Sequence, residues 1–202
     1  MKHFPLLAAV FEGLLTPLAI GLGWLLGTPA LAKLFHFSGQ DALLGVAAAL
    51  PPLALFWFCL VSSWRPFVEI RKITVETLVP LFRDCGLAQL AIISALAGLG
   101  EETLFRGVVQ AGAAQTIGGP YGLWLGLLLA AILFGALHLI TPAYGILAGL
   151  IGLYLGGLWL LSGNLLTPIV THGVYDFLAL MYLVRVRGKD EARMTNDKGN
   201  DE

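Results

Sequence analysis

Long apolar runs recur along the chain, separated by short stretches that contain prolines, glycines or polar residues. Roughly 20 apolar residues are enough for a helix to cross the hydrocarbon core of a bilayer. The apolar and polar residues do not alternate, as they would in the strands of a closed membrane barrel. The pattern therefore predicts an all-α, polytopic membrane protein, a helical bundle of about six transmembrane helices. The predicted spans are residues 5–26, 42–62, 86–113, 122–141, 143–162 and 165–184.

The composition agrees with this class of protein. Hydrophobic residues make up 57% of the 202 residues and charged residues only 12%, whereas soluble domains contain about 25% charged residues. The formal net charge of −1 gives no reason to expect nucleic acid as a partner. The expected partner is the lipid bilayer, and nothing in the sequence indicates an oligomeric state.

A more polar segment at residues 64–84 separates the second span from the third. Its basic residues are Arg65, Arg71, Lys72 and Arg83. We expect an amphipathic helix that lies in the membrane interface, with Phe67, Ile70 and Val75 on its lipid-facing side.

The basic residues also indicate how the chain is oriented. Apart from the segment 64–84, they gather in the tail at residues 185–202, and the loop after the first span offers only Lys33. Because Lys and Arg favour the cytoplasmic side, we expect both termini in the cytoplasm, with the chain in the cell membrane of a prokaryote. The tail has no apolar run and is predicted to be disordered, following a single membrane domain at residues 1–184.

Ionisable side chains occur inside the predicted spans, where charge is costly and usually serves a function. Glu101, Glu102 and Arg106 lie in the third span, His138 in the fourth, and His172 and Asp176 in the sixth. Glu12, in the first span, has no evident partner, and we interpret it as a residue near the interface rather than as part of a cavity.

Helical spacing gives the two adjacent glutamates different surroundings. Glu102 and Arg106 are four residues apart and share a helix face, which favours an ion pair. Glu101 is five residues from Arg106 and points away from it, so its carboxylate is free to face a cavity. A purely structural salt bridge between helices is the alternative explanation for the charged pair.

Two histidines could act together with Glu101. His138 shares a helix face with Phe134, and His172 shares one with Asp176, although each pair alone also fits a packing role. The predicted boundaries place His138 nearer the cytoplasmic end of its span than Glu101 or His172. A shift of this span by one turn or a cavity open to the cytoplasm would bring the groups together, and we favour the cavity because hydrolysis needs water to enter. The three spans then offer a carboxylate base, two imidazoles and a carboxylate that orients one of them, as activation of water requires.

These residues resemble the three motifs of the CAAX protease and bacteriocin-processing family of intramembrane proteases, also called the Abi family. The family motifs are E-E-x-x-x-R, F-x-x-x-H and H-x-x-x-N or D. This chain has EETLFR from Glu101, FGALH from Phe134 and HGVYD from His172, in that order. The resemblance covers about residues 86–180 and implies an intramembrane endopeptidase that cuts a membrane-associated peptide or protein.

The resemblance also implies a role for each motif residue. The catalytic residues would be Glu101, His138, His172 and Asp176, supported by an ion pair between Glu102 and Arg106. Glu101 would activate water and His138 would help to hold it. His172, with Asp176, would stabilise the oxyanion of the reaction.

The need for a metal ion is left open by the sequence. Glu101, His138 and His172 could bind a divalent ion such as Zn²⁺, since catalytic zinc sites often use two His and one Glu. The chain has no H-E-x-x-H sequence, however, and a Glu–His pair can position water without a metal. We favour the metal-independent chemistry.

Two other functions are compatible with buried charges in a membrane. A proton-coupled transporter would also bury Glu, Arg and His, but transporters are usually built from repeated halves with broken helices. All three motifs here lie in the last four spans. A non-catalytic membrane scaffold of the same fold is the other alternative. The substrate is not indicated, because family members cut prenylated C-terminal segments, leader peptides or C-terminal sorting segments.

The predicted topology can be tested by cysteine accessibility in intact cells. In a variant without its own two cysteines, Lys72→Cys and Thr195→Cys should both be protected from a membrane-impermeant thiol reagent. Lys33→Cys should react with the same reagent. Labelling that placed residue 72 and the tail on opposite sides would contradict the six-span arrangement.

Overall fold

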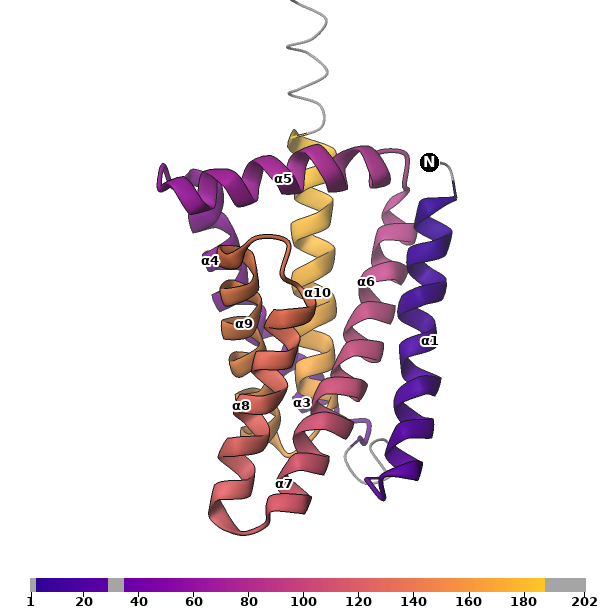
Figure 1. Cartoon of the computed structure of the whole chain (residues 1–202). Helices are drawn as coiled ribbons and strands as arrows, with labels where there is room; N and C mark the ends of the chain where they lie inside the picture. The colour runs from indigo at the N-terminus through magenta and orange to yellow at the C-terminus, as the bar shows by residue number, and fades with distance from the viewer. Residues whose placement is uncertain (1–2, 29–34, 188–202) are drawn as a thin grey trace, which may run out of the picture.

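The computed structural model describes residues 3–28 and 35–187 (Figure 1). Within these ranges the regular elements are helices and no strand occurs, so the prediction of an all-α protein is confirmed. Lys33 and residues 188–202, which make up most of the predicted tail, lie outside the described residues. The helices are α1 (Phe4–Leu25), α3 (Gly39–Ala48), α4 (Leu50–Val61), α5 (Arg65–Phe82), α6 (Leu87–Glu102), α7 (Ala111–Ile117), α8 (Gly119–Leu137), α9 (Pro142–Ser162) and α10 (Leu166–Tyr182), with π-helical segments η1 (Thr103–Gln110) and η2 (Leu183–Arg187).

Six helical segments of the described chain are long and apolar enough to cross a membrane, which confirms the predicted number of spans. α1, α8 and α9 each form one of them. The other three are α3 continued by α4, α6 continued by η1 and α7, and α10 continued into η2. The start of α1 and the end of α10 lie at the same end of the bundle, as an even number of spans requires (Figure 1).

Two span ends differ from the prediction by four residues each. The third span continues to Ile117, and the fourth ends at Leu137 instead of residue 141. The early end of α8 follows from the start of α9, where the Thr141 side chain accepts a hydrogen bond from the Tyr144 N–H (3.1 Å) and Pro142 stands in the first turn. Because proline disfavours a helical conformation in the residue before it, His138 lies in the connection between the two helices.

The second span is interrupted where two consecutive prolines predict a kink. α3 ends at Ala48, and Pro51 and Pro52 stand in the first turn of α4. The first N–H groups of a helix have no partner inside it, so proline is tolerated there.

α5 lies across one end of the bundle, over the ends of the spans (Figure 1). The predicted interfacial helix is therefore present, but the predicted direction of its apolar face is wrong. Phe67 and Ile70 are buried with Cys59 of α4 against partly buried residues of α9, and Val75 is buried against Leu60. The ends of α4, α9 and α10 cover the apolar face of α5, so this face points to protein instead of lipid.

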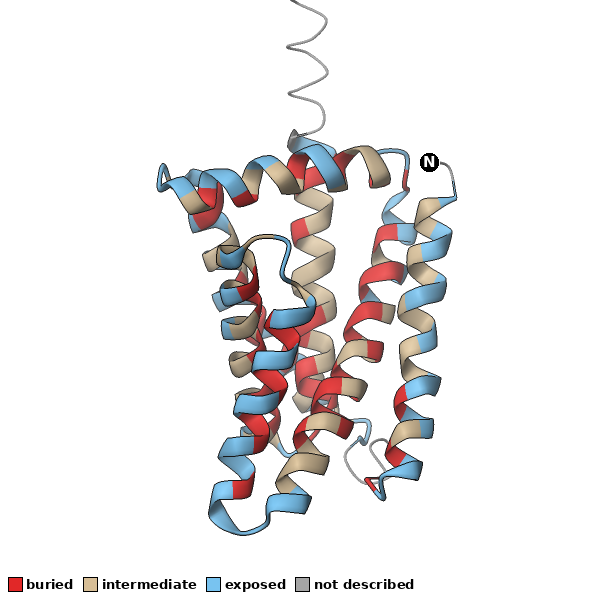
Figure 2. Cartoon of the chain, in the orientation of Figure 1, coloured by how far each residue is buried: buried red, intermediate tan, exposed pale blue. Residues whose placement is uncertain are grey.

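α6 lies between α1 and α10, and buried residues follow much of its length (Figure 2). Two of its glycines permit the close approach. A Cβ atom on Gly98 would lie 2.7 Å from the Ile169 carbonyl oxygen of α10, and one on Gly100 would lie 2.6 Å from the Glu12 carbonyl oxygen of α1. Small residues at such crossings are how helices pack closely in membranes.

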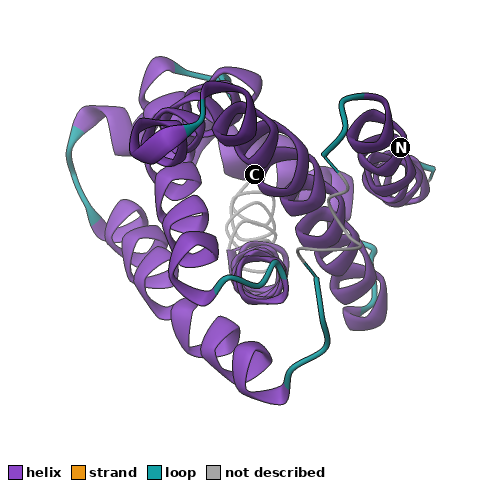
Figure 3. Cartoon of the chain, turned by 90° about the horizontal axis from the view of Figure 1, so that it is seen from below, coloured by secondary structure: helices purple, strands orange, loops and turns teal. Residues whose placement is uncertain are grey.

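The hairpin of α8 and α9 packs against η1 on another side of the third span. Seen along the spans, α1 stands at the edge of the bundle (Figure 3). The third span is thus in contact with α1, α8, α9 and α10. This central position brings its charged residues to the same level as those of α8 and α10.

Candidate active site

The centre of the third span contains a fully buried ion pair. Nη1 of Arg106 lies 2.9 Å from Oε1 of Glu102, and both side chains are 0% exposed. The pairing is the one that the spacing predicts. Glu101, the neighbouring residue, is absent from this pair, again as the spacing predicts.

The same ion pair also joins two other spans. Nη2 of Arg106 donates a hydrogen bond to the Gly152 carbonyl oxygen of α9 (2.7 Å). Nδ1 of His172, on α10, donates to the same Glu102 oxygen that binds Arg106 (2.8 Å). The Arg106 guanidinium lies 5.0 Å from the ring centre of Phe134 on α8, a favourable cation–π distance. The sequence did not indicate the contact between His172 and Glu102, because residues on different spans have no spacing to compare.

The helix around Arg106 is wound as a π-helix over the eight residues of η1. Arg106 and Gln110 both point at α9, where the Gln110 amide donates to the Gly156 carbonyl oxygen (3.3 Å). A Cβ atom on Gly156 would lie 2.5 Å from the Gln110 side-chain oxygen, so the contact requires glycine there. Short π-helical segments inside α-helices are frequent at functional sites.

Glu101 has a different environment from Glu102. Its side chain is 13% exposed, and its Oε2 atom has no hydrogen-bond partner in the described structure. Nε2 of His138 is the nearest imidazole nitrogen, 3.9 Å from that oxygen. A gap of this length between a carboxylate and an imidazole is too wide for a direct hydrogen bond and is a distance that one water molecule can bridge.

His138 is held in a defined orientation by the end of α8. Its Nδ1 atom lies 2.8 Å from the Phe134 carbonyl oxygen, and its ring stacks on the Phe134 ring with the centres 4.4 Å apart. A carbonyl oxygen can only accept, so Nδ1 carries the proton. In the neutral ring, Nε2 therefore presents a lone pair toward Glu101.

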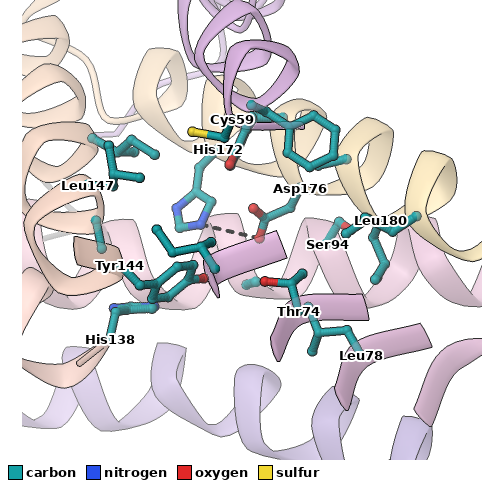
Figure 4. A pocket seen from close by; sticks show the side chains of 18 of the residues that line it. Cys59, Thr74, Leu78, Ser94, His138, Tyr144, Leu147, His172, Asp176 and Leu180 are labelled. Carbon is teal, nitrogen blue, oxygen red and sulfur yellow. Dashed lines mark ion pairs between the residues drawn. The ribbon is translucent and has the colours of Figure 1, made fainter. Parts of the chain in front are cut away.

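His172 lies between two carboxylates. Nδ1 contacts Glu102, as described above, and Nε2 lies 3.4 Å from Oδ2 of Asp176. Asp176 is the more exposed of the two acids, with 34% of its side chain accessible. Figure 4 shows His172 and Asp176 directed at one another, with His138 and Tyr144 in the same pocket.

These side chains line one cavity of about 400 Å³. Its polar lining includes Glu12, Glu101, His138, Tyr144, His172 and Asp176. Away from these residues the cavity is lined mainly by apolar side chains, and it extends to α5 through Thr74, Leu78 and Phe82. The structure thus brings the predicted site residues together around a cavity that reaches the end of the bundle covered by α5.

Our interpretation of Glu12 as a residue near the interface is wrong. Glu12 lines the cavity together with Glu101, and its Oε2 atom is buried without a hydrogen-bond partner in the described structure. The close crossing of α1 and α6 at Gly100 brings Glu12 to this position. Tyr144 and Tyr175 also line the cavity. Tyr144 lies outside the motifs, and Tyr175 occupies a position within H-x-x-x-D that the motif leaves unspecified.

The predicted metal ligands do not converge in this arrangement. Among the described residues, no group of three or more His, Cys, Asp and Glu side chains is placed to hold a metal ion. Both nitrogens of His172 already face carboxylate groups. Glu101 and His138 face each other through one pair of atoms, Oε2 of the glutamate and Nε2 of the histidine. The donor set therefore does not fit the two-histidine, one-glutamate site that Zn²⁺ would need.

Comparisons with known proteins find a match to the motif-bearing part of the chain. A family model described as "Type II CAAX prenyl endopeptidase Rce1-like" matches residues 84–178. A protein of Escherichia coli described as an uncharacterized 24.3 kDa protein is 32% identical over 170 residues, which are 81% of this chain and 64% of that protein. The chain thus spans just under two thirds of the length of this relative. No solved structure matches this chain.

The buried ion pair generates a prediction about stability. Arg106→Ala should lower the free energy of unfolding by about 3–5 kcal/mol, because it leaves the Glu102 carboxylate buried without its arginine. The double variant Glu102→Gln, Arg106→Gln removes both charges and should regain part of that loss. Reversible unfolding in detergent micelles, followed by tryptophan fluorescence, measures both values.

A matched control is Arg71→Ala. Arg71 is half-buried and donates to the carbonyl oxygens of Leu60 and Ser62, so its removal orphans no carboxylate. Arg71→Ala should therefore lower the free energy of unfolding by less than Arg106→Ala does. A double variant no more stable than Arg106→Ala would count against the importance of the pairing.

Proposed function

Through residues 84–178 this chain belongs to the Rce1-like family of type II CAAX prenyl endopeptidases, and from that premise we propose that it is an intramembrane endopeptidase. It hydrolyses a peptide bond of a membrane-associated protein or peptide. The observation that carries the proposal is the unpaired Glu101 oxygen, which faces the lone pair of His138 across 3.9 Å inside a cavity. This is a place where a water molecule can be held between two acceptors.

In the proposed reaction, Glu101 and His138 bind the hydrolytic water. Glu101 removes a proton from it while the water oxygen attacks the carbonyl carbon of the scissile bond. His138 accepts the second hydrogen of the water and orients it, since its Nδ1 proton is bound to the Phe134 carbonyl. General-base assistance of this kind contributes roughly 10²–10⁴-fold to a rate.

The negative charge of the intermediate needs a positive partner. His172 can donate toward both Glu102 and Asp176 only when both of its ring nitrogens carry a proton, and the ring is then a cation at the wall of the cavity. We propose that this cation stabilises the oxyanion. Asp176, the more exposed of the two acids, holds the Nε2 side of the ring. Glu102, which is paired with Arg106, holds the Nδ1 side.

The lining of the cavity is suited to bind a hydrophobic segment of the substrate. Between the charged residues and α5 its lining is mainly apolar, with Leu78, Phe82 and Leu180 among the side chains. A prenylated C-terminal segment, a leader peptide and a C-terminal sorting segment would all place apolar groups there. With Arg71 and Thr74 of α5 at the cavity, we propose entry at the α5 end, which is the cytoplasmic end if both termini lie in the cytoplasm.

Glu101→Gln should abolish peptide cleavage while leaving the fold intact, because the amide keeps the shape of the side chain and removes the base. Comparative peptidomics of membranes that contain the wild type or Glu101→Gln identifies cleaved peptides, and one of them then serves as substrate in proteoliposomes. We expect a decrease in kcat of about 10²–10⁴-fold. Ile132→Ala, on the lipid-exposed side of α8, is the control and should cleave normally. Near wild-type cleavage by purified Glu101→Gln would refute the assignment.

The proposed chemistry also predicts resistance to chelators. The donor atoms do not converge on a metal position, so we expect the purified enzyme to keep its activity after incubation with 1,10-phenanthroline and dialysis against EDTA. Metal analysis of the same sample should find no stoichiometric zinc. Loss of cleavage that added Zn²⁺ restores would replace this mechanism with a metal-dependent one.

A further inference from the structure

A third carboxylate lies at the site in addition to the motif residues. Glu12 of α1 lines the same cavity as Glu101, and the Oε2 atoms of both residues are buried without hydrogen-bond partners in the described structure. The α1 backbone at Glu12 touches α6 at Gly100, the residue next to Glu101. Glu101, Asp176, His172 and His138 are all within electrostatic range of the Glu12 carboxyl group.

Two neighbouring carboxyl groups in a poorly solvated cavity have different roles when they share one proton. Two negative charges close together in such surroundings repel each other, and a single proton held between them removes the repulsion. Glu101 and Glu12 line the same cavity, whereas Glu102 is neutralised by Arg106. One of the two cavity carboxyl groups can then accept a proton while the other donates one.

Hydrolysis of a peptide bond needs such a donor, because the amine leaves only after its nitrogen has been protonated. Neither imidazole is placed to supply that proton. The Nδ1 proton of His138 is bound to the Phe134 carbonyl oxygen, and its Nε2 presents a lone pair. Both nitrogens of His172 face carboxylates. Among the acids on the cavity wall, Glu12 makes no ion pair or side-chain hydrogen bond with the residues that the structure describes, and its Oε2 atom is buried.

We propose that Glu12 is the general acid of the reaction, an inference that rests on the proposed function. Glu101 takes one proton from water, and the water oxygen forms a bond to the carbonyl carbon. When the carbon–nitrogen bond breaks, the nitrogen takes the proton of the Glu12 carboxyl group. The products are a carboxylic acid and an amine, Glu101 is protonated and Glu12 is ionised. Transfer of the proton from Glu101 to Glu12 restores the starting state.

The test compares two substrates that differ only in the type of bond that is cleaved. The first is the peptide identified by peptidomics, and the second has a thioester in place of the scissile amide. A thiolate leaves without a proton because the pKa of a thiol is only about 8.5, whereas an amine does not. Glu12→Gln should therefore lower kcat for the amide by about 10²–10⁴-fold and change cleavage of the thioester by less than about tenfold. Glu12→Asp should restore part of the amide activity.

The controls separate a chemical effect from a structural one. Thr16→Val replaces a half-buried side chain of α1 that does not line the cavity and whose buried oxygen has no hydrogen-bond partner among the described residues. This variant should cleave both substrates normally. Glu101→Gln should lose both activities. Equal loss of amide and thioester cleavage in Glu12→Gln, or no loss of either, would overturn the role of Glu12 while leaving Glu101 as the base. Full activity of Glu101→Gln on both substrates would instead refute the proposed function, and the role of Glu12 with it.

Discussion

A guanidinium group with no exposed surface, in the middle of a membrane-spanning helix, is the constraint on which the arrangement of the spans depends. Arg106 must find its counter-charge and its hydrogen-bond acceptors inside the protein, since the hydrocarbon around the bundle offers none. Glu102 supplies the charge, Gly152 a carbonyl oxygen and Phe134 the face of a ring. These partners belong to three different spans, so satisfying one side chain fixes how α8 and α9 sit against η1.

The Glu102–Arg106 ion pair gives the two adjacent glutamates, Glu101 and Glu102, different surroundings. Glu102 faces the sealed interior, and its Oε1 atom binds both Arg106 and His172. Glu101, one position earlier, turns to the cavity and keeps an oxygen free. The π-helical winding that follows directs Arg106 and Gln110 to the backbone of α9, where Gly156 leaves room for the Gln110 side chain. Arg106, which holds the bundle together, is therefore paired with Glu102 and not with the carboxylate that lines the cavity.

Much of this arrangement could be predicted from the sequence, and the parts that could not have a common cause. The number of spans follows from apolar length, and the Glu102–Arg106 pair follows from a four-residue spacing, because both are properties of one segment. The burial of Phe67, the contact of His172 with Glu102 and the position of Glu12 depend on which helices become neighbours. Helical periodicity says which side chains share a face but not what covers that face. The resemblance to the family motifs predicted that residues of α6, α8 and α10 share one site, because the motifs together describe a whole site. It gave no indication of α1, which carries no motif.

The end of α8 shows the same limit at smaller scale. Apolar residues continue past His138 to Ile140, so hydropathy alone extends the span, whereas the cap and proline that open α9 end it earlier. This short displacement moves His138 from the body of a helix into a turn. Its ring is then oriented by the backbone carbonyl of Phe134 and not by a neighbouring span.

The buried network also has a consequence for how the protein is made. Gly152 and His172 are synthesised after Arg106, in the fifth and sixth spans. When the third span reaches the membrane, its charges have only one another, and an arginine at the centre of an isolated helix costs roughly 2.5–3.5 kcal/mol to insert. The third span therefore gains its full stability only when the hairpin of α8 and α9 and then α10 have joined it. The network around Arg106 is therefore complete only when the last span, which carries His172, has joined the bundle.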